Sequence, residues 1–140
     1  MRRSGSRNPL RIYVRGGIVD NCLAAALYRR ADIGLNLYRS GKGWGKDAPP
    51  VERAESLNPR AVELAACGVF TLSDYRAEVA EIFGDAVPTF RTPAELEYLV
   101  RYYLTCKDER QEKAARLPGL IAGHTFGARV ATLTGVLESV

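Results

Sequence analysis

Short apolar segments alternate with helical segments along this chain, and this order constrains the fold more than any other feature. The sequence predicts strands at 11–14, 32–38, 69–72 and 87–90, and Pro88 favours an edge position for the last of them. Strand–helix–strand order is typical of a parallel sheet with helices on its faces. We therefore expect an α/β fold, a partial Rossmann-like parallel sheet of about four strands with flanking helices and C-terminal helices.

Capping residues mark where the helices begin. Asp20 or Asn21 is expected to cap the first helix, and Ser73-Asp74 a short one. Residues 92–95 form a capping box with proline at the first helical position, which predicts a helix start. A charged helix is expected at about 108–117. The last helix is expected to begin at Thr125. The apolar positions expected on these helices are Leu23, Leu27 and Ala31; Val79, Ile82 and Phe83; Leu96, Leu99, Val100, Tyr103 and Leu104; and Phe126, Val130, Leu133 and Leu137.

The segment 55–68 contains a further helix with an acid on either side of its start. Asn58 is a good N-cap, Pro59 suits the first helical position, and Gly68 suits the left-handed residue that ends a helix. Glu55 precedes the helix, and Glu63 lies about one turn inside it. This arrangement predicts a helix start that is open to ligands, followed directly by a strand.

Loops at the carboxyl ends of parallel strands converge on the ligand in folds of this kind. The amides from Ser56 to Arg60 lie near a helix N-terminus, which favours a phosphate, and Arg60 is suited to pair with a phosphate oxygen. The Glu63 carboxylate is placed to accept hydrogen bonds from sugar hydroxyls. In the alternative interpretation Glu63 is a surface residue and Arg60 is its ion-pair partner.

The segment 39–53 has no apolar periodicity and is rich in glycine and proline, which predicts a long loop. It lacks the glycine spacing of known phosphate loops. One interpretation is a lid that carries Lys42 and Lys46 towards an anion. The other is a mobile surface loop.

The positive charge of the chain is concentrated at its N-terminus. The formal net charge is +4, but five arginines lie in the first fifteen residues without any acid, and the rest of the chain has 15 basic and 16 acidic residues. We expect residues 1–15 to be a basic, flexible arm and 16–140 to be the domain. The arm is interpreted either as a solvated leader or, less favoured, as a contact for nucleic acid or anionic surfaces.

Cysteine and histidine usage excludes several classes of site. Cys22, Cys67 and Cys106 are widely spaced and odd in number, which predicts neither a disulfide framework nor a zinc site. We expect them to be small buried hydrophobic residues in a cytoplasmic protein, and His124 to be structural. No apolar run approaches the roughly 20 residues of a membrane span. No metal or cofactor is expected.

Several motifs resemble GT-B glycosyltransferases. Residues 23–37 are similar to their L-x-x-L-Y-x-x-A-D-h-x-h segment, where h is apolar. Glu55 to Glu63 matches their E-x7-E motif, and residues 63–68 resemble their E-A-x-A-C-G run. Segments 56–60, 73–76 and 87–93 look like the branch related to the spore maturation protein CgeB. The resemblance extends from about Gly17 to the C-terminus.

The resemblance implies a nucleotide-sugar donor site and sugar transfer of the retaining type without a metal. It implies that Glu63 holds the nucleotide ribose and that Arg60 contacts a phosphate. It also implies that the catalytic Glu55 faces the donor sugar, together with the backbone from Ser56 through Leu57 to Asn58, which faces the pyrophosphate. The residues expected to bind the donor are thus Arg39, Lys42, Ser56, Leu57, Asn58, Arg60 and Glu63.

The resemblance covers only the second half of a GT-B donor-binding domain. A complete enzyme of this fold has two Rossmann-like domains and more than twice this length. The resemblance thus implies an uncovered sheet edge, which favours a homodimer or a partner chain that supplies the missing domain. Two other hypotheses remain open: a non-catalytic remnant or interaction module of the same fold, and a nucleic-acid binder that uses the arginine arm.

Overall fold

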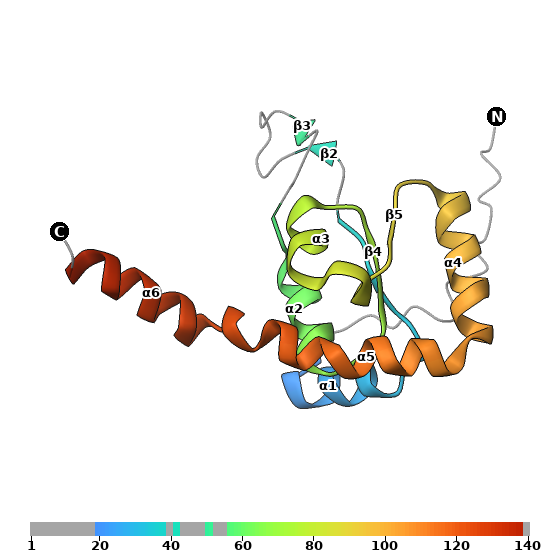
Figure 1. Ribbon diagram of the computed structural model, residues 1–140, viewed down its shortest axis with the longest axis horizontal. Coiled ribbons are helices and arrows are strands. Elements are labelled where there is room, and N and C mark those ends of the chain that lie inside the picture. Colours follow the sequence, from blue (N-terminus) through green and yellow to red (C-terminus); the bar gives the residue numbers. More distant parts are fainter. Residues whose placement is uncertain (1–18, 39–40, 43–49, 52–55, 139–140) are drawn as a thin grey trace, which may run out of the picture.

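A computed structural model describes residues 19–38, 41–42, 50–51 and 56–138 (Figure 1). Its central sheet has three parallel strands in the order β1-β4-β5: β1 is Gly34–Asn36, β4 is Thr71–Asp74 and β5 is Thr89–Phe90. The predicted α/β class with a parallel sheet is confirmed. The first of the four predicted strands, at 11–14, lies outside the described residues. β5 is an edge strand of this sheet, as Pro88 predicted.

The described part of the chain contains six α-helices. They are α1 (Asn21–Arg29), α2 (Pro59–Ala66), α3 (Ala77–Phe83), α4 (Pro93–Thr105), α5 (Lys107–Ile121) and α6 (Phe126–Glu138). Short 3-10 turns follow α3 at Gly84–Ala86 and α5 at Ala122–His124. α6 projects away from the rest of the molecule (Figure 1).

Side chains cap four of these helices, mostly as the sequence predicts. Asp20 accepts a hydrogen bond from the Leu23 amide at 2.9 Å, and Asn58 accepts one from the Ala61 amide at 2.9 Å. The other two caps follow the same rule, with Thr92 accepting from the Glu95 amide and Thr125 from the Ala128 amide. The Glu95 carboxylate accepts from the amide of Arg91. Gly68 has a φ of 65°, the left-handed conformation expected after α2.

Helices cover both faces of the sheet. Leu72 of β4 packs with Phe90 and Tyr103 against apolar residues of α4. A Cβ on Gly34 of β1 would lie 3.0 Å from the Leu64 side chain, so the other face is covered by α2. A second apolar cluster, which includes Ala65, Val79, Phe83 and Leu117, joins α2, α3 and α5. The core therefore lies in two layers, one on each side of the strands.

The prediction for β4 and the start of α3 was wrong by two residues. β4 runs to Asp74, so Ser73 and Asp74 lie in the strand and do not cap α3. The N-cap position is Arg76, which makes no side-chain capping hydrogen bond. The strand continues through these polar residues because the buried Ser73 hydroxyl has a side-chain partner in the neighbouring strand.

The segment predicted as an unstructured loop contains a short antiparallel pair. β2 (Gly41–Lys42) pairs with β3 (Pro50–Val51), with Gly41 opposite Val51. Backbone hydrogen bonding between the two ends of this segment provides order that side-chain periodicity does not reveal.

Several residues on the predicted apolar faces of the helices are exposed. Leu104 of α4 is exposed, as is the predicted apolar face of α1 at Leu23 and Leu27. The stripe of α6 is exposed along its length, with Phe126 91% exposed. Apolar spacing identifies a helical face but not the presence of a partner for it.

The prediction that the three cysteines are buried was also wrong. All three are free; Cys22 is exposed, and Cys67 and Cys106 are half-buried. The last two lie at helix boundaries rather than within helices. No helix in the described ranges is both long enough and apolar enough to cross a membrane.

Candidate functional site

Polar side chains meet at the carboxyl ends of β1 and β4. Asn36 and Ser73 are each 0% exposed, and the Asn36 side-chain nitrogen donates a hydrogen bond to the Ser73 hydroxyl at 3.0 Å. The Ser73 hydroxyl donates in turn to the Asp74 carbonyl oxygen at 2.9 Å. Buried polar groups are costly unless they are paired, so this cluster is a specific feature of the carboxyl edge of the sheet.

The Asn36 side chain lies on the face of the sheet that α2 covers. Residues two apart on a strand share a face, so Asn36 lies on the same face as Gly34, which packs against Leu64. α2 runs antiparallel to the strands, so the carboxyl end of β1 lies near the N-terminus of α2. The Asn36 Oδ1 atom is buried without a hydrogen-bond partner among the described residues. It is an unsatisfied acceptor near the start of a helix.

Asp74 is the charged member of this edge. Its Oδ2 atom accepts from the Tyr38 amide at 3.4 Å and from the Arg76 guanidinium at 3.3 Å, whereas its buried Oδ1 atom has no partner within the described ranges. Burial raises the pKa of Asp74, and the neighbouring Arg76 guanidinium opposes that shift. The Arg76 guanidinium also lies over the Tyr38 ring, 4.4 Å from its centroid.

The start of α2 is tied to two other elements. The Asn58 amide donates to the Tyr38 hydroxyl at 3.1 Å, which connects the helix to the residues after β1. The Leu57 amide donates to the Glu78 carboxylate of α3. The N-terminus of α2 therefore lies at the carboxyl edge, as the sequence predicts, and two of its backbone donors already have partners.

The other predicted donor-binding residues are distributed around this helix start. Ser56, Arg60 and Glu63 are exposed. The Tyr28 hydroxyl of α1 donates to Glu63 Oε2 at 3.4 Å, and no ion pair joins Glu63 to Arg60 in the part of the chain that the structure describes. The alternative interpretation was therefore right about the exposure of Glu63 but wrong about its partner.

Three predicted residues have no side-chain position to report. Arg39 and the predicted catalytic Glu55 lie outside the described residues. Lys42 lies in β2, and its side chain is likewise outside the description. Their roles stay predictions.

Sequence reasoning missed the residues that organise the site. The sequence carries a signal for Asn36, a polar residue inside an apolar strand. Glu78 and Tyr38 carry no such signal, because their contacts with the start of α2 join residues 21 and 20 positions apart. The described residues contain no group of three or more histidine, cysteine or acidic side chains that could hold a metal ion.

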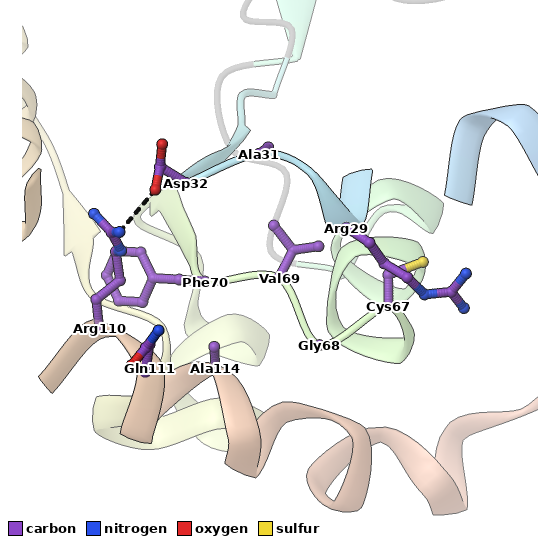
Figure 2. A pocket seen from close by; sticks show the side chains of 10 residues that line it. All are labelled: Arg29, Ala31, Asp32, Cys67, Gly68, Val69, Phe70, Arg110, Gln111 and Ala114. Atoms are coloured by element: carbon purple, nitrogen blue, oxygen red, sulfur yellow. Dashed lines mark hydrogen bonds and ion pairs between the residues drawn. The ribbon is translucent and has the colours of Figure 1, made fainter. Parts of the chain in front are cut away.

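A separate hollow of about 250 Å³ lies at the opposite, amino edge of the sheet (Figure 2). It is lined by the segments that precede β1 and β4 and by α5. Asp32 and Arg110 pair across it at 2.8 Å, and the Arg110 guanidinium also donates to the Tyr103 carbonyl oxygen at 2.9 Å. Of the two arginines that line the hollow, Arg110 is therefore paired with groups of the chain itself, whereas Arg29 lies at the other side (Figure 2).

The comparison with known protein families gives one match that covers most of the chain. The model of a family described as glycosyl transferase-like matches residues 4–135. No curated protein and no solved structure gives a significant match.

Proposed function

The chain belongs to the glycosyl transferase-like family, and from that premise we propose that it binds a nucleotide-sugar donor at the carboxyl edge of its sheet. The reaction is transfer of the sugar to an acceptor hydroxyl. The bond between the anomeric carbon and the phosphate oxygen breaks, and the nucleoside diphosphate leaves with the electron pair. The acceptor oxygen bonds to the anomeric carbon and loses its proton. By resemblance to GT-B enzymes, the configuration of the sugar is retained.

The observation that carries this proposal is the position of Glu63. It lies one turn inside a helix whose start contacts the residues after β1, through the Asn58 amide and the Tyr38 hydroxyl. Its carboxylate is exposed and, among the described residues, has one weak neutral contact, with Tyr28. An exposed acceptor beside a helix N-terminus suits a ligand that carries both hydroxyls and phosphates.

Each residue has a role in this proposal. Glu63 accepts hydrogen bonds from the ribose hydroxyls, and the exposed Arg60 pairs with the pyrophosphate. The backbone at 56–58 faces the pyrophosphate, and Glu55 faces the sugar. Arg39 and Lys42 contribute positive charge from the segment that follows β1.

Calorimetry with UDP, GDP and their sugars tests the donor site. We expect binding by the wild-type chain, and a loss of at least about ten-fold in affinity for Glu63→Ala, because a charged hydrogen-bond acceptor is removed. Glu112→Ala, at an exposed acid of α5, is the matched control and is expected to bind as wild type does. Absence of binding at millimolar nucleotide, or equal binding by Glu63→Ala, would contradict the proposal.

A second candidate function is an interaction module of the same fold without turnover. The observation that favours it is the exposed apolar stripe of α6, because contiguous exposed apolar side chains mark surfaces that contact other chains. Release of free UDP from UDP-sugars in the presence of acceptors separates the two. Donor binding without any release or transfer would favour the module.

A further inference from the structure

Glu78 places a carboxylate at the helix start where the donor phosphate is proposed to bind. It lies in the first turn of α3, and its Oε2 atom accepts a hydrogen bond from the Leu57 amide. Leu57 directly precedes Asn58, the N-cap of α2. A helix N-terminus attracts anions, and in this structure the anion is a side chain of the chain itself.

The same carboxylate has a second neighbour, which is a cation. Glu78 Oε1 lies 4.0 Å from the Arg129 guanidinium of α6. The Glu78 side chain is 32% exposed and that of Arg129 is 60% exposed, so neither is held in a closed interior. The carboxylate thus lies between the α2 N-terminus and an exposed cation on the projecting helix.

The polar surroundings of this helix start are not saturated by Glu78. The side chain of Asn36, fully buried at the carboxyl end of β1 on the face of the sheet that α2 covers, has an Oδ1 atom without a partner among the described residues. Buried acceptors of this kind are usually satisfied by a water or by a ligand. This observation is independent of the Glu78 contact, and it calls for a hydrogen-bond donor, such as a water or a sugar hydroxyl, at the same end of the sheet.

We propose that Glu78 is a displaceable occupant of the donor phosphate position, and that donor binding moves its carboxylate from the Leu57 amide to Arg129. This inference rests on the proposed donor site. The phosphate gains the Leu57 amide, and Glu78 keeps a charged partner on α6. Because only the fraction of molecules with a vacant helix start binds directly, occupation by Glu78 weakens the apparent affinity for the donor.

The test is titration of the full chain with UDP, comparing Glu78→Gln with wild type. The glutamine can still accept a hydrogen bond from Leu57 but has no charge, so UDP is expected to bind roughly five- to ten-fold more tightly, the effect of one charge at a helix N-terminus. Glu81→Gln, at an exposed acid of the same helix, is the control and is expected to bind as wild type does. Arg129→Gln removes the alternative partner and is expected to weaken binding by about two- to three-fold.

The Leu57 amide supplies a readout of the contact itself. Its proton resonance is expected to shift on addition of UDP, and Glu78→Gln is expected to shift it before any ligand is added. Equal affinities of wild type and Glu78→Gln, or weaker binding by Glu78→Gln, would overturn the role of Glu78 and leave the donor site intact. If neither protein binds UDP, the donor site itself is refuted and this inference falls with it.

Discussion

The two edges of the sheet differ in how their polar groups are satisfied. At the amino edge, Arg110 pairs with Asp32, and Asp85 receives hydrogen bonds from Lys113 and Arg116 of α5. At the carboxyl edge, acceptor atoms of Asn36 and Asp74 are buried without partners among the described residues. The amino edge holds α5 to the sheet, whereas the carboxyl edge retains unused hydrogen-bonding capacity.

The difference explains why we propose the site at the carboxyl edge, although the hollow lies at the amino edge. The hollow in Figure 2 lies at the amino edge, and Arg110, one of the two arginines that line it, is engaged in contacts that stabilise the fold. A ligand there would have to compete with those contacts. At the carboxyl edge a ligand would supply partners that the fold lacks, at the place where α/β folds bind their ligands.

The largest expected effect on stability comes from removing the Arg110 contacts at the amino edge. Arg110→Ala should lower the free energy of unfolding by about 2–3 kcal/mol, because it removes a buried side chain and leaves the Tyr103 carbonyl oxygen without its donor. Urea denaturation measures this loss. Asp32→Asn is the control, and since the Asp32 side chain is 71% exposed its loss should stay below about 1 kcal/mol. Equal losses in the two variants would show that the ion pair itself, rather than burial of Arg110, holds α5.

The matching change at the carboxyl edge should leave stability nearly unchanged. Asn36→Leu with Ser73→Ala replaces a buried polar pair by apolar groups, which is close to neutral or stabilising in other proteins. The same double variant should lose at least about ten-fold in UDP affinity, because it removes the buried polar side chains at the carboxyl edge, where the donor is proposed to bind. Urea denaturation and calorimetry on one sample separate the two effects. A large loss of stability with unchanged binding would reverse the assignment of the two edges.

The sequence predicts most of the fold because its signals are local. The caps at Asp20, Asn58, Thr92 and Thr125 and the left-handed Gly68 are properties of a few adjacent residues, and all are confirmed. The end of β4 is predicted less well. There a hydrogen bond between Ser73 and Asn36, 37 residues apart, lets the strand extend through polar residues.

The candidate site is predictable in position but not in its contacts. The order of strand, helix and strand places the start of α2 at the carboxyl edge, and the position of Glu63 follows from the helical repeat. The contacts of Tyr38 and Glu78 with the α2 start depend on how three elements pack together. The charges and the spacing of residues in the sequence do not predict such packing.

A smaller effect is expected at Gly68, which lines the amino-edge hollow. Gly68→Ala should cost about 1 kcal/mol, because alanine is strained at a φ of 65° even though a Cβ there would make only an ordinary contact with Pro118. Gly119→Ala is the matched control: it lies in α5 with open space around it, and it should stabilise the chain by about 0.5–1 kcal/mol. Thermal unfolding measures both. Opposite signs in the two variants identify backbone conformation, rather than the added methyl group, as the cause.

The smallest expected effect is the pH dependence of the Asp85 contacts, which tests whether the charges of the amino edge are satisfied. Hydrogen bonds from the Arg116 guanidinium, and secondarily from Lys113, hold the pKa of Asp85 well below its usual range. The ionised form is thus favoured by folding, so its contribution to stability is present above about pH 4, the pKa range of an unfolded aspartate, and is lost as the pH falls below it. Asp85→Asn should therefore melt slightly below wild type at pH 7, and the difference should narrow as the pH falls towards 2. Because Asp85 is exposed, 1 M NaCl should also reduce the difference at pH 7. A difference that is constant with pH and salt would mean that the loss arises from packing around the turn, and that charge pairing does not distinguish this edge from the other.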